Sequence, residues 1–242
     1  MKKKLILFVA FLCLQISAFS QDKPTNKVYG VFESKTLFQL GMLEDSAGNS
    51  ITPVLRFAPF ANYTLQAHKD LGNKFGVYTG IGIKNVGFIS RDNTNDVTVK
   101  SRAYCISVPV GLKYGNLKED RYLFINGEFL AQFDYKEKVF TNDGNDKSKR
   151  KSFYPNDINP FNYAGSIGFN LKGFIIGAEY TFSDFFSDKY RFQPDKANAA
   201  VTLAGPSKSN ILTFFFGFRT NLSAEAVAAP EKQLQQAKAY QY

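Results

Sequence analysis

The stretch that decides the fold is AYCISVPVGLKY, residues 103–114. Every second position is apolar or aromatic: Tyr104, Ile106, Val108, Val110, Leu112 and Tyr114. The positions between them carry Cys105, Ser107, Pro109, Gly111 and Lys113. A period of two belongs to a β-strand whose two faces meet different surroundings. The stretch therefore predicts one strand with an apolar face and a face of small and polar residues.

The same alternation recurs in other segments, which gives about eight strands in all. In YLFINGEFLAQFDY, residues 122–135, it predicts that Phe133 and Tyr135 share the apolar face and that Asp134 lies on the polar one. The remaining segments are one strand of less regular alternation within 28–42, VLRFAPFANYTLQA (54–67), FGVYTGIGIKN (75–85), NYAGSIGFN (162–170), FIIGAEYTFSDF (174–185) and NILTFFFGFRTNL (210–222).

The connections between these segments alternate strictly between short and long. The short ones are DLGNK (70–74), GNLKED (115–120) and NLKG (170–173), and the long ones are EDSAGNS (44–50), RDNTND (91–96), a loop of about twenty residues over 140–160, and residues 187–209. In an up-and-down barrel, this alternation collects the tight turns at the periplasmic end and the long loops outside. The sequence thus predicts an all-β, eight-stranded antiparallel up-and-down transmembrane β-barrel over residues 27–222.

The first residues, MKKKLILFVAFLCLQISAFSQ, predict an export signal. Three lysines precede an apolar run that is too short to span a bilayer, and small residues follow at cleavage spacing. We expect a signal peptide over 1–20, a short periplasmic segment over 21–26 and a periplasmic tail with weak helical character over 223–242. Cleavage leaves Cys105 as the single cysteine, so no intrachain disulfide is expected.

The contents of the two faces favour a membrane barrel over a soluble lipocalin-like one, in which the apolar face would point inward. The polar face is rich in Gly, Ala and Ser with isolated charges, as a narrow lumen requires, and the aromatic content is 16%. A charge network that plugs the lumen is predicted from Lys35, Arg56, Lys84, Lys113, Glu128, Asp134, Glu179 and Arg219. Lipid-facing positions are predicted at Phe57, Ile81, Val108, Phe129, Ile176, Phe214, Phe216 and Phe218.

Three stretches resemble a known family: ISVPVGLKYG (106–115), RYLFINGEF (121–129) and AGSIGFNLKGFIIGAEYTFSDF (164–185). They are similar to the small outer-membrane β-barrel proteins of Bacteroidota-type Gram-negative bacteria, the PorT-like group. The resemblance implies an integral outer-membrane barrel, and PorT itself is linked to type IX secretion. The pattern of this family offers no catalytic motif that the sequence could match. The tail after Leu222 departs from barrels that end on their closing aromatic strand.

The sequence offers little for catalysis or cofactor binding. His68, the only histidine, is expected beside a tight turn and far from the long loops, so a hydrogen-bonded or solvated rim histidine is favoured over a general base. No catalytic, metal or cofactor-binding residue is predicted, and no cofactor. The net charge of +9 is not interpreted as nucleic-acid binding, because the protein is exported and its basic residues are dispersed except in KSKRK, 147–151.

Three functions remain open. The leading hypothesis is a non-conducting structural or interaction protein of the outer membrane, without enzyme activity. The alternatives are a small-ligand or narrow-channel transport barrel and, more weakly, a membrane enzyme. Expected partners are outer-membrane lipids, lipopolysaccharide or a glycan at the outer loops, and a periplasmic protein at the tail.

Overall fold

The computed structural model describes residues 28–44, 48–92, 97–141, 146–154, 156–190 and 208–222. The predicted signal peptide, the segment 21–26 and the tail 223–242 lie outside the described residues. In the part of the chain that is described, no helix is long and apolar enough to cross a membrane.

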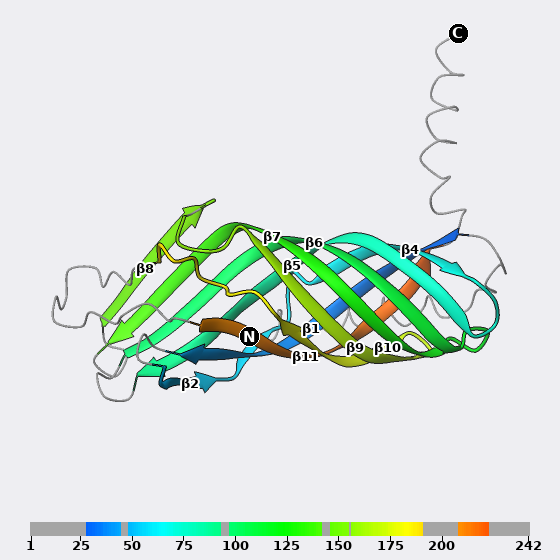
Figure 1. The fold of residues 1–242 in the computed structure, drawn as a ribbon, viewed down its shortest axis with the longest axis horizontal. Coiled ribbons are helices and arrows are strands. Elements are labelled where there is room, and N and C mark those ends of the chain that lie inside the picture. The colour runs from blue at the N-terminus through cyan, green and yellow to red at the C-terminus, as the bar shows by residue number, and fades with distance from the viewer. Residues whose placement is uncertain are drawn as a thin grey trace, which may run out of the picture.

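The described chain forms one antiparallel sheet that closes into a long barrel with tilted strands (Figure 1). Its strands are β1 (Val28–Glu44), β2 (Ser50–Val54), β3 (Arg56–Ala58), β4 (Tyr63–Asp70), β5 (Phe75–Asp92), β6 (Val97–Asn116), β7 (Arg121–Thr141), β8 (Asp146–Phe153), β9 (Phe161–Leu171), β10 (Phe174–Thr181) and β11 (Lys208–Leu222).

Eight positions around the ring account for the eleven strands. β2, β3 and β4 all pair with β1 and so share one position, and β8 and β9 both pair with β7 and share another. The ring closes where β11 pairs with β1, from Gly30 opposite Leu222 to Glu44 opposite Lys208. The predicted eight-stranded antiparallel barrel is confirmed.

The second ring position is interrupted, whereas the sequence pattern predicted one strand there. The break lies between β3 and β4, where Pro59 has no N–H to give to a strand neighbour and Ala61 has a positive φ of 61°. Asn62 bridges the break, because its side-chain amide donates to the carbonyl of Ala58 and its side-chain oxygen accepts from the backbone N–H of Asn85.

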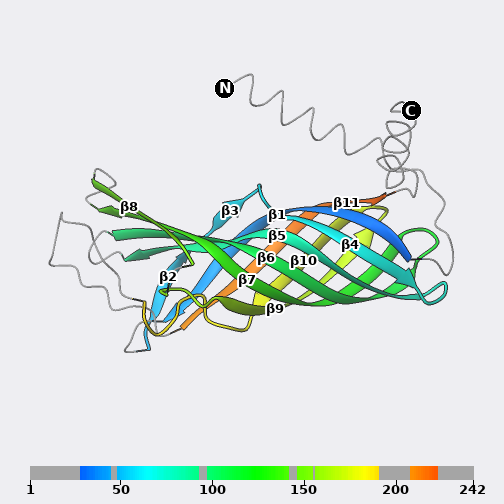
Figure 2. The same ribbon diagram turned by 90° about the horizontal axis from the view of Figure 1, so that it is seen from above.

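The two ends of the barrel differ. The tight turns β4–β5, β6–β7 and β9–β10 gather at the end where β1 begins and β11 finishes (Figures 1 and 2). At the opposite end β6 and β7 stay paired well past the last residue of β7 that pairs with β9, and β8 pairs with the last part of β7. The alternation of short and long connections therefore has the geometry predicted from the sequence.

The expected loop over 140–160 is wrong for much of its length, because residues 146–153 form β8. Lys147 lies opposite Phe140, and Phe153 lies opposite Asp134. The sequence hid this strand because DKSKRKSF is almost entirely polar, and charged residues are depleted in ordinary strands. β8 itself has no apolar face to reveal it.

A β-bulge in β7 inverts the predicted pattern of faces. Cys105 lies opposite Gln132 and Tyr104 lies opposite Asp134, so Phe133 is the extra residue. Beyond this point, the odd-numbered residues of β7 point inward, and Tyr135 is fully buried. A bulge shifts the side-chain phase by one residue, so the prediction that Tyr135 is on the apolar outer face is wrong.

Candidate functional site

The barrel wall separates two sets of side chains. On β6, residues 105, 107, 109, 111 and 113 are buried, whereas 106, 108, 110, 112 and 114 are exposed. Of the positions predicted to face lipid, six are exposed and two, Phe129 and Phe218, are half-buried; the exposed ones are Phe57, Ile81, Val108, Ile176, Phe214 and Phe216. These side chains give the molecule an apolar exterior around a polar interior.

The centre of the interior holds an ionic group of three side chains. The ammonium Nζ of Lys84 on β5 lies 2.5 Å from Glu128 Oε2 on β7 and 2.5 Å from Glu179 Oε2 on β10. β5 and β10 are not neighbours in the sheet, so this contact crosses the interior. All three side chains are buried, and each carboxylate receives a charge-assisted hydrogen bond.

A second ion pair lies on β1. Lys35 Nζ is 2.7 Å from Glu33 Oε1, which also accepts a hydrogen bond from the side-chain amide of Gln66 on β4. The Lys35 ammonium also lies 4.8 Å from the ring centroid of Phe215, a phenylalanine of β11 that points inward. The sequence reasoning named Lys35 but gave Phe215 no role.

Near the tight-turn end, the interior is filled by the side chains of Lys113 and Arg219 together with those of neighbouring tyrosines. Lys113 Nζ lies 2.6 Å from Asp70 Oδ1 and donates to the hydroxyl of Tyr29 at 2.9 Å. The Arg219 guanidinium lies 5.2 Å from the ring centroid of Tyr122 and 3.9 Å from Asp120 Oδ1. The carboxylate that Arg219 approaches therefore comes from the β6–β7 turn and not from another strand of the predicted network.

Two predicted members of the charge network lie elsewhere. Arg56 is buried, but it donates to Gln39 Oε1 and Asn85 Oδ1 and not to a carboxylate. Asp134 sits after the bulge, and its ion pair is with the exposed Lys151 at 3.7 Å. The structure brings neither residue into contact with the Lys84 group.

The side chain of His68 on β4 is buried inside the barrel. Its Nε2 lies 2.7 Å from Gln66 Oε1, and its ring stacks on Tyr78 with centroids 4.8 Å apart. This is a hydrogen-bonded, packed histidine. Within the described ranges, no group of three or more His, Cys, Asp or Glu side chains is placed to hold a metal ion.

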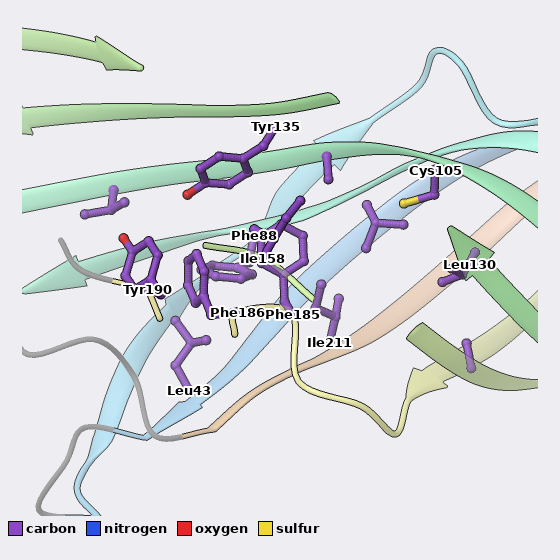
Figure 3. Close-up of a cluster of buried hydrophobic side chains, with 14 of the residues drawn as sticks. Leu43, Phe88, Cys105, Leu130, Tyr135, Ile158, Phe185, Phe186, Tyr190 and Ile211 are labelled. Carbon is purple, nitrogen blue, oxygen red and sulfur yellow. The ribbon is translucent and has the colours of Figure 1, made fainter. Parts of the chain in front are cut away.

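An aromatic cluster fills the interior at the end opposite the tight turns (Figure 3). Phe185 and Phe186 come from the chain after β10 and contact Phe88 of β5, with ring centroids 5.3 and 5.5 Å away. The carboxylate of Glu137 accepts hydrogen bonds from the hydroxyls of Tyr135 and Tyr190. We call Phe88, Tyr135, Ile158, Phe185, Phe186 and Tyr190 the outer plug.

A match to a family of known proteins identifies the class of protein to which this barrel belongs. Residues 19–187, more than half of the chain, match the outer membrane protein beta-barrel domain family. The chain belongs to that family. A search of curated protein sequences gave no match. As a member of the family it is an outer-membrane protein, although the match ends before β11, the strand that closes the ring on β1.

Solved outer-membrane barrels are similar in fold. Ail, the attachment invasion locus protein of Yersinia pestis, was solved with the heparin analogue sucrose octasulfate; it is 13% identical over 80% of this chain and 99% of its own, with a TM-score of 0.38. Neisserial surface protein A is 8% identical over 80% and 98%, with a TM-score of 0.36. The N-terminal barrel of Pseudomonas aeruginosa OprF is 7% identical over 81% and 99%, with a TM-score of 0.31. At such identities the likeness concerns the fold alone.

The sequence named Lys84, Glu128 and Glu179 as members of a charge network in this outer-membrane barrel but gave no indication of Asp70 as the partner of Lys113, and the outer plug was not predicted. Phe185 and Phe186 stand in FSDFFSDKY, residues 182–190, after the alternation of β10 has ended. Two adjacent phenylalanines between aspartates fit neither face of a strand. That misfit was the available signal that the chain leaves the wall and turns inward.

Proposed function

We propose that this outer-membrane protein is a non-conducting barrel that acts as a structural or interaction protein and not as an enzyme. The single observation that carries the proposal is Lys84, held between Glu128 and Glu179 across the interior. An eight-stranded barrel is just wide enough for its side chains to fill the inside. A buried ionic group at the centre leaves ions little room to pass.

The outer plug supports the same proposal by an independent route. Phe185, Phe186 and Tyr190 belong to the chain after β10, yet they are almost completely buried inside the ring. Aromatic side chains at a constriction oppose the entry of water and ions. Two barriers of different chemistry thus lie in series along the barrel axis.

Planar-bilayer recordings on the refolded protein test this function. We expect little or no single-channel conductance from the natural chain. A variant that removes both barriers, F185A/F186A/K84A/E128A/E179A, should open discrete conducting events. The matched control F182A/F214A removes two phenylalanines that are exposed on the outside, and it should stay silent. Steady conductance or saturable solute flux through the natural chain would favour the transport alternative and contradict the proposal.

We further propose that residues 1–20 direct export, that the chain is PorT-like, and that the tail after Leu222 meets a periplasmic protein. The sequence patterns described above support these three statements. Truncation after Leu222, followed by a pull-down from intact outer membranes, tests the last of them. The same partners recovered with and without the tail would refute it.

A further inference from the structure

The outer wall beyond the apolar band carries an array of positive charge. Seven basic side chains point to the same side of the extended strands β6, β7 and β8, which project past the ring in Figures 1 and 2. We call this array the basic face; its members are Lys100, Arg102, Lys136, Lys138, Lys147, Lys149 and Lys151.

The register places like charges directly opposite one another. Lys138 stands between Lys100 and Lys149, and Lys136 stands between Arg102 and Lys151. Like charges at directly opposed positions destabilise a sheet. The pairing of β6 with β7 and of β7 with β8 nevertheless aligns these side chains side by side. A site for a polyanion requires such an alignment of cations.

Few carboxylates are available to neutralise this array among the side chains that the structure describes. Asp134 lies 3.7 Å from Lys151 at one edge. Glu137 belongs to the opposite face of β7, where it accepts hydrogen bonds from Tyr135 and Tyr190. In keeping with this, the pKa of Lys138 is lowered by partial burial and by the charges of its lysine neighbours, Lys147 and Lys149 first among them.

A cleft of about 260 Å³ lies where the basic face meets β3 and β5. Its lining combines five cationic side chains with two apolar ones and contains no carboxylate; it consists of Arg56, Phe57, Ile89, Lys100, Ser101, Arg102, Lys136 and Lys138. This volume is slightly below the usual range of pockets for drug-sized ligands. It suits an anionic headgroup better than an extended chain.

The position of the basic face along the strand points to the source of the anion. On β6, the exposed apolar row ends at Ile106, and Tyr104, Arg102 and Lys100 follow on the same side. Four residues of strand span about 13 Å, or roughly 10 Å of height at the tilt of a barrel strand. The polar headgroup layer of a bilayer begins at the edge of the hydrocarbon and is about 5–8 Å thick on each side, so with Ile106 at that edge Tyr104 lies within the layer and Arg102 at its outer limit.

We propose that the basic face binds the phosphorylated headgroup of a lipid in the outer leaflet, with its phosphate in the cleft between Lys100, Arg102 and Lys138. The inference rests on the proposed membrane barrel and adds a ligand class and a site to it. The cations lie on the side wall of the strands, level with the headgroups, so the surrounding membrane supplies the anion. Phe57 and Ile89 then contact the less polar part of the lipid.

Native mass spectrometry of the full chain, released from phosphatidylcholine nanodiscs with and without diphosphoryl lipid A, tests the proposal. We expect retained lipid A on the natural protein. K100Q/K138Q removes two lysines that face the phosphate. At the affinity that each lysine typically contributes near an anionic surface, this loss should weaken lipid A retention roughly thirty-fold. K100R/K138R keeps the charges and should retain the lipid.

The control K69Q/K118Q removes two exposed lysines at the tight-turn end and should bind lipid A as the natural chain does. Equal retention in K100Q/K138Q would overturn the proposal. So would binding of soluble heparin fragments to protein in phosphatidylcholine discs without any preference for lipid A, because the anion would then come from outside the membrane. Heat-modifiable gel migration and insertion into the discs test the membrane barrel itself, so its failure is seen separately.

Discussion

Replacing Lys84 by methionine tests the interior ionic group directly. Both carboxylate oxygens lie 2.5 Å from the same ammonium, so they are at most about 5 Å apart. Two negative charges at that distance repel by roughly 3 kcal/mol at an effective dielectric constant of about 20. Removing one member of a buried ion pair typically destabilises a protein by about 3–5 kcal/mol. We therefore expect K84M to lower the free energy of unfolding by about that amount.

Urea unfolding of the refolded barrel in lipid vesicles measures this loss. Far-UV circular dichroism is the suitable signal, because the chain has no tryptophan. The triple variant K84M/E128Q/E179Q removes the repulsion and should regain most of the lost stability, whereas K118M, at an exposed turn lysine, should change little. A K84M barrel within about 1 kcal/mol of the natural one, or a triple variant no more stable than K84M, would refute the reasoning.

Two further predictions concern the closure of the barrel and its outer end. In G217V, the first added carbon would clash with the Ser34 carbonyl oxygen in the strand pair that closes the ring, so we expect loss of the folded, heat-modifiable band on gels; a normal band would contradict this. At the outer end, the pKa of Lys138 is lowered by burial and neighbouring lysines, whereas that of Lys208 is raised by its hydrogen bond to Glu44. A lowered pKa leaves more neutral amine at a given pH, so competitive acetylation should modify Lys138 faster than Lys208. The variant K147Q/K149Q removes two neighbouring charges and should slow the acetylation of Lys138. Equal acetylation rates throughout would count against the charge array.

Much of the barrel wall could be predicted because one physical rule governs it. Wherever a strand separates an apolar exterior from a filled interior, residues alternate, as they do from Cys105 to Tyr114. Lys84, Glu128 and Glu179 followed from the same rule, since each stands on the inward phase of its strand. Their mutual contact did not follow, because it depends on the register of the strands that lie between them.

The features that escaped prediction lie where this rule stops. The bulge at Phe133 changes the phase without changing the composition, so Asp134 and Tyr135 were assigned to the wrong faces. β8 is a strand without an apolar face, and Phe185 and Phe186 are apolar residues outside a strand. In each case tertiary contacts decide the structure. The bulge and β8 leave no sign in the local pattern, whereas the adjacent Phe185 and Phe186 leave only a misfit to both faces of a strand.

The orientation of the wall is the central claim, and spin labels test it most directly. With Cys105 replaced by serine, cysteines introduced at Phe216 and Ile176 carry labels on the exposed apolar face, and cysteines at Thr213 and Asn126 carry labels on the buried face. In vesicles, we predict that the first pair collides with oxygen dissolved in hydrocarbon and is shielded from a water-soluble nickel reagent, whereas the second pair is shielded from hydrocarbon. Nickel access at 216 and 176 together with hydrocarbon contact at 213 and 126 would mean that the barrel is inside out.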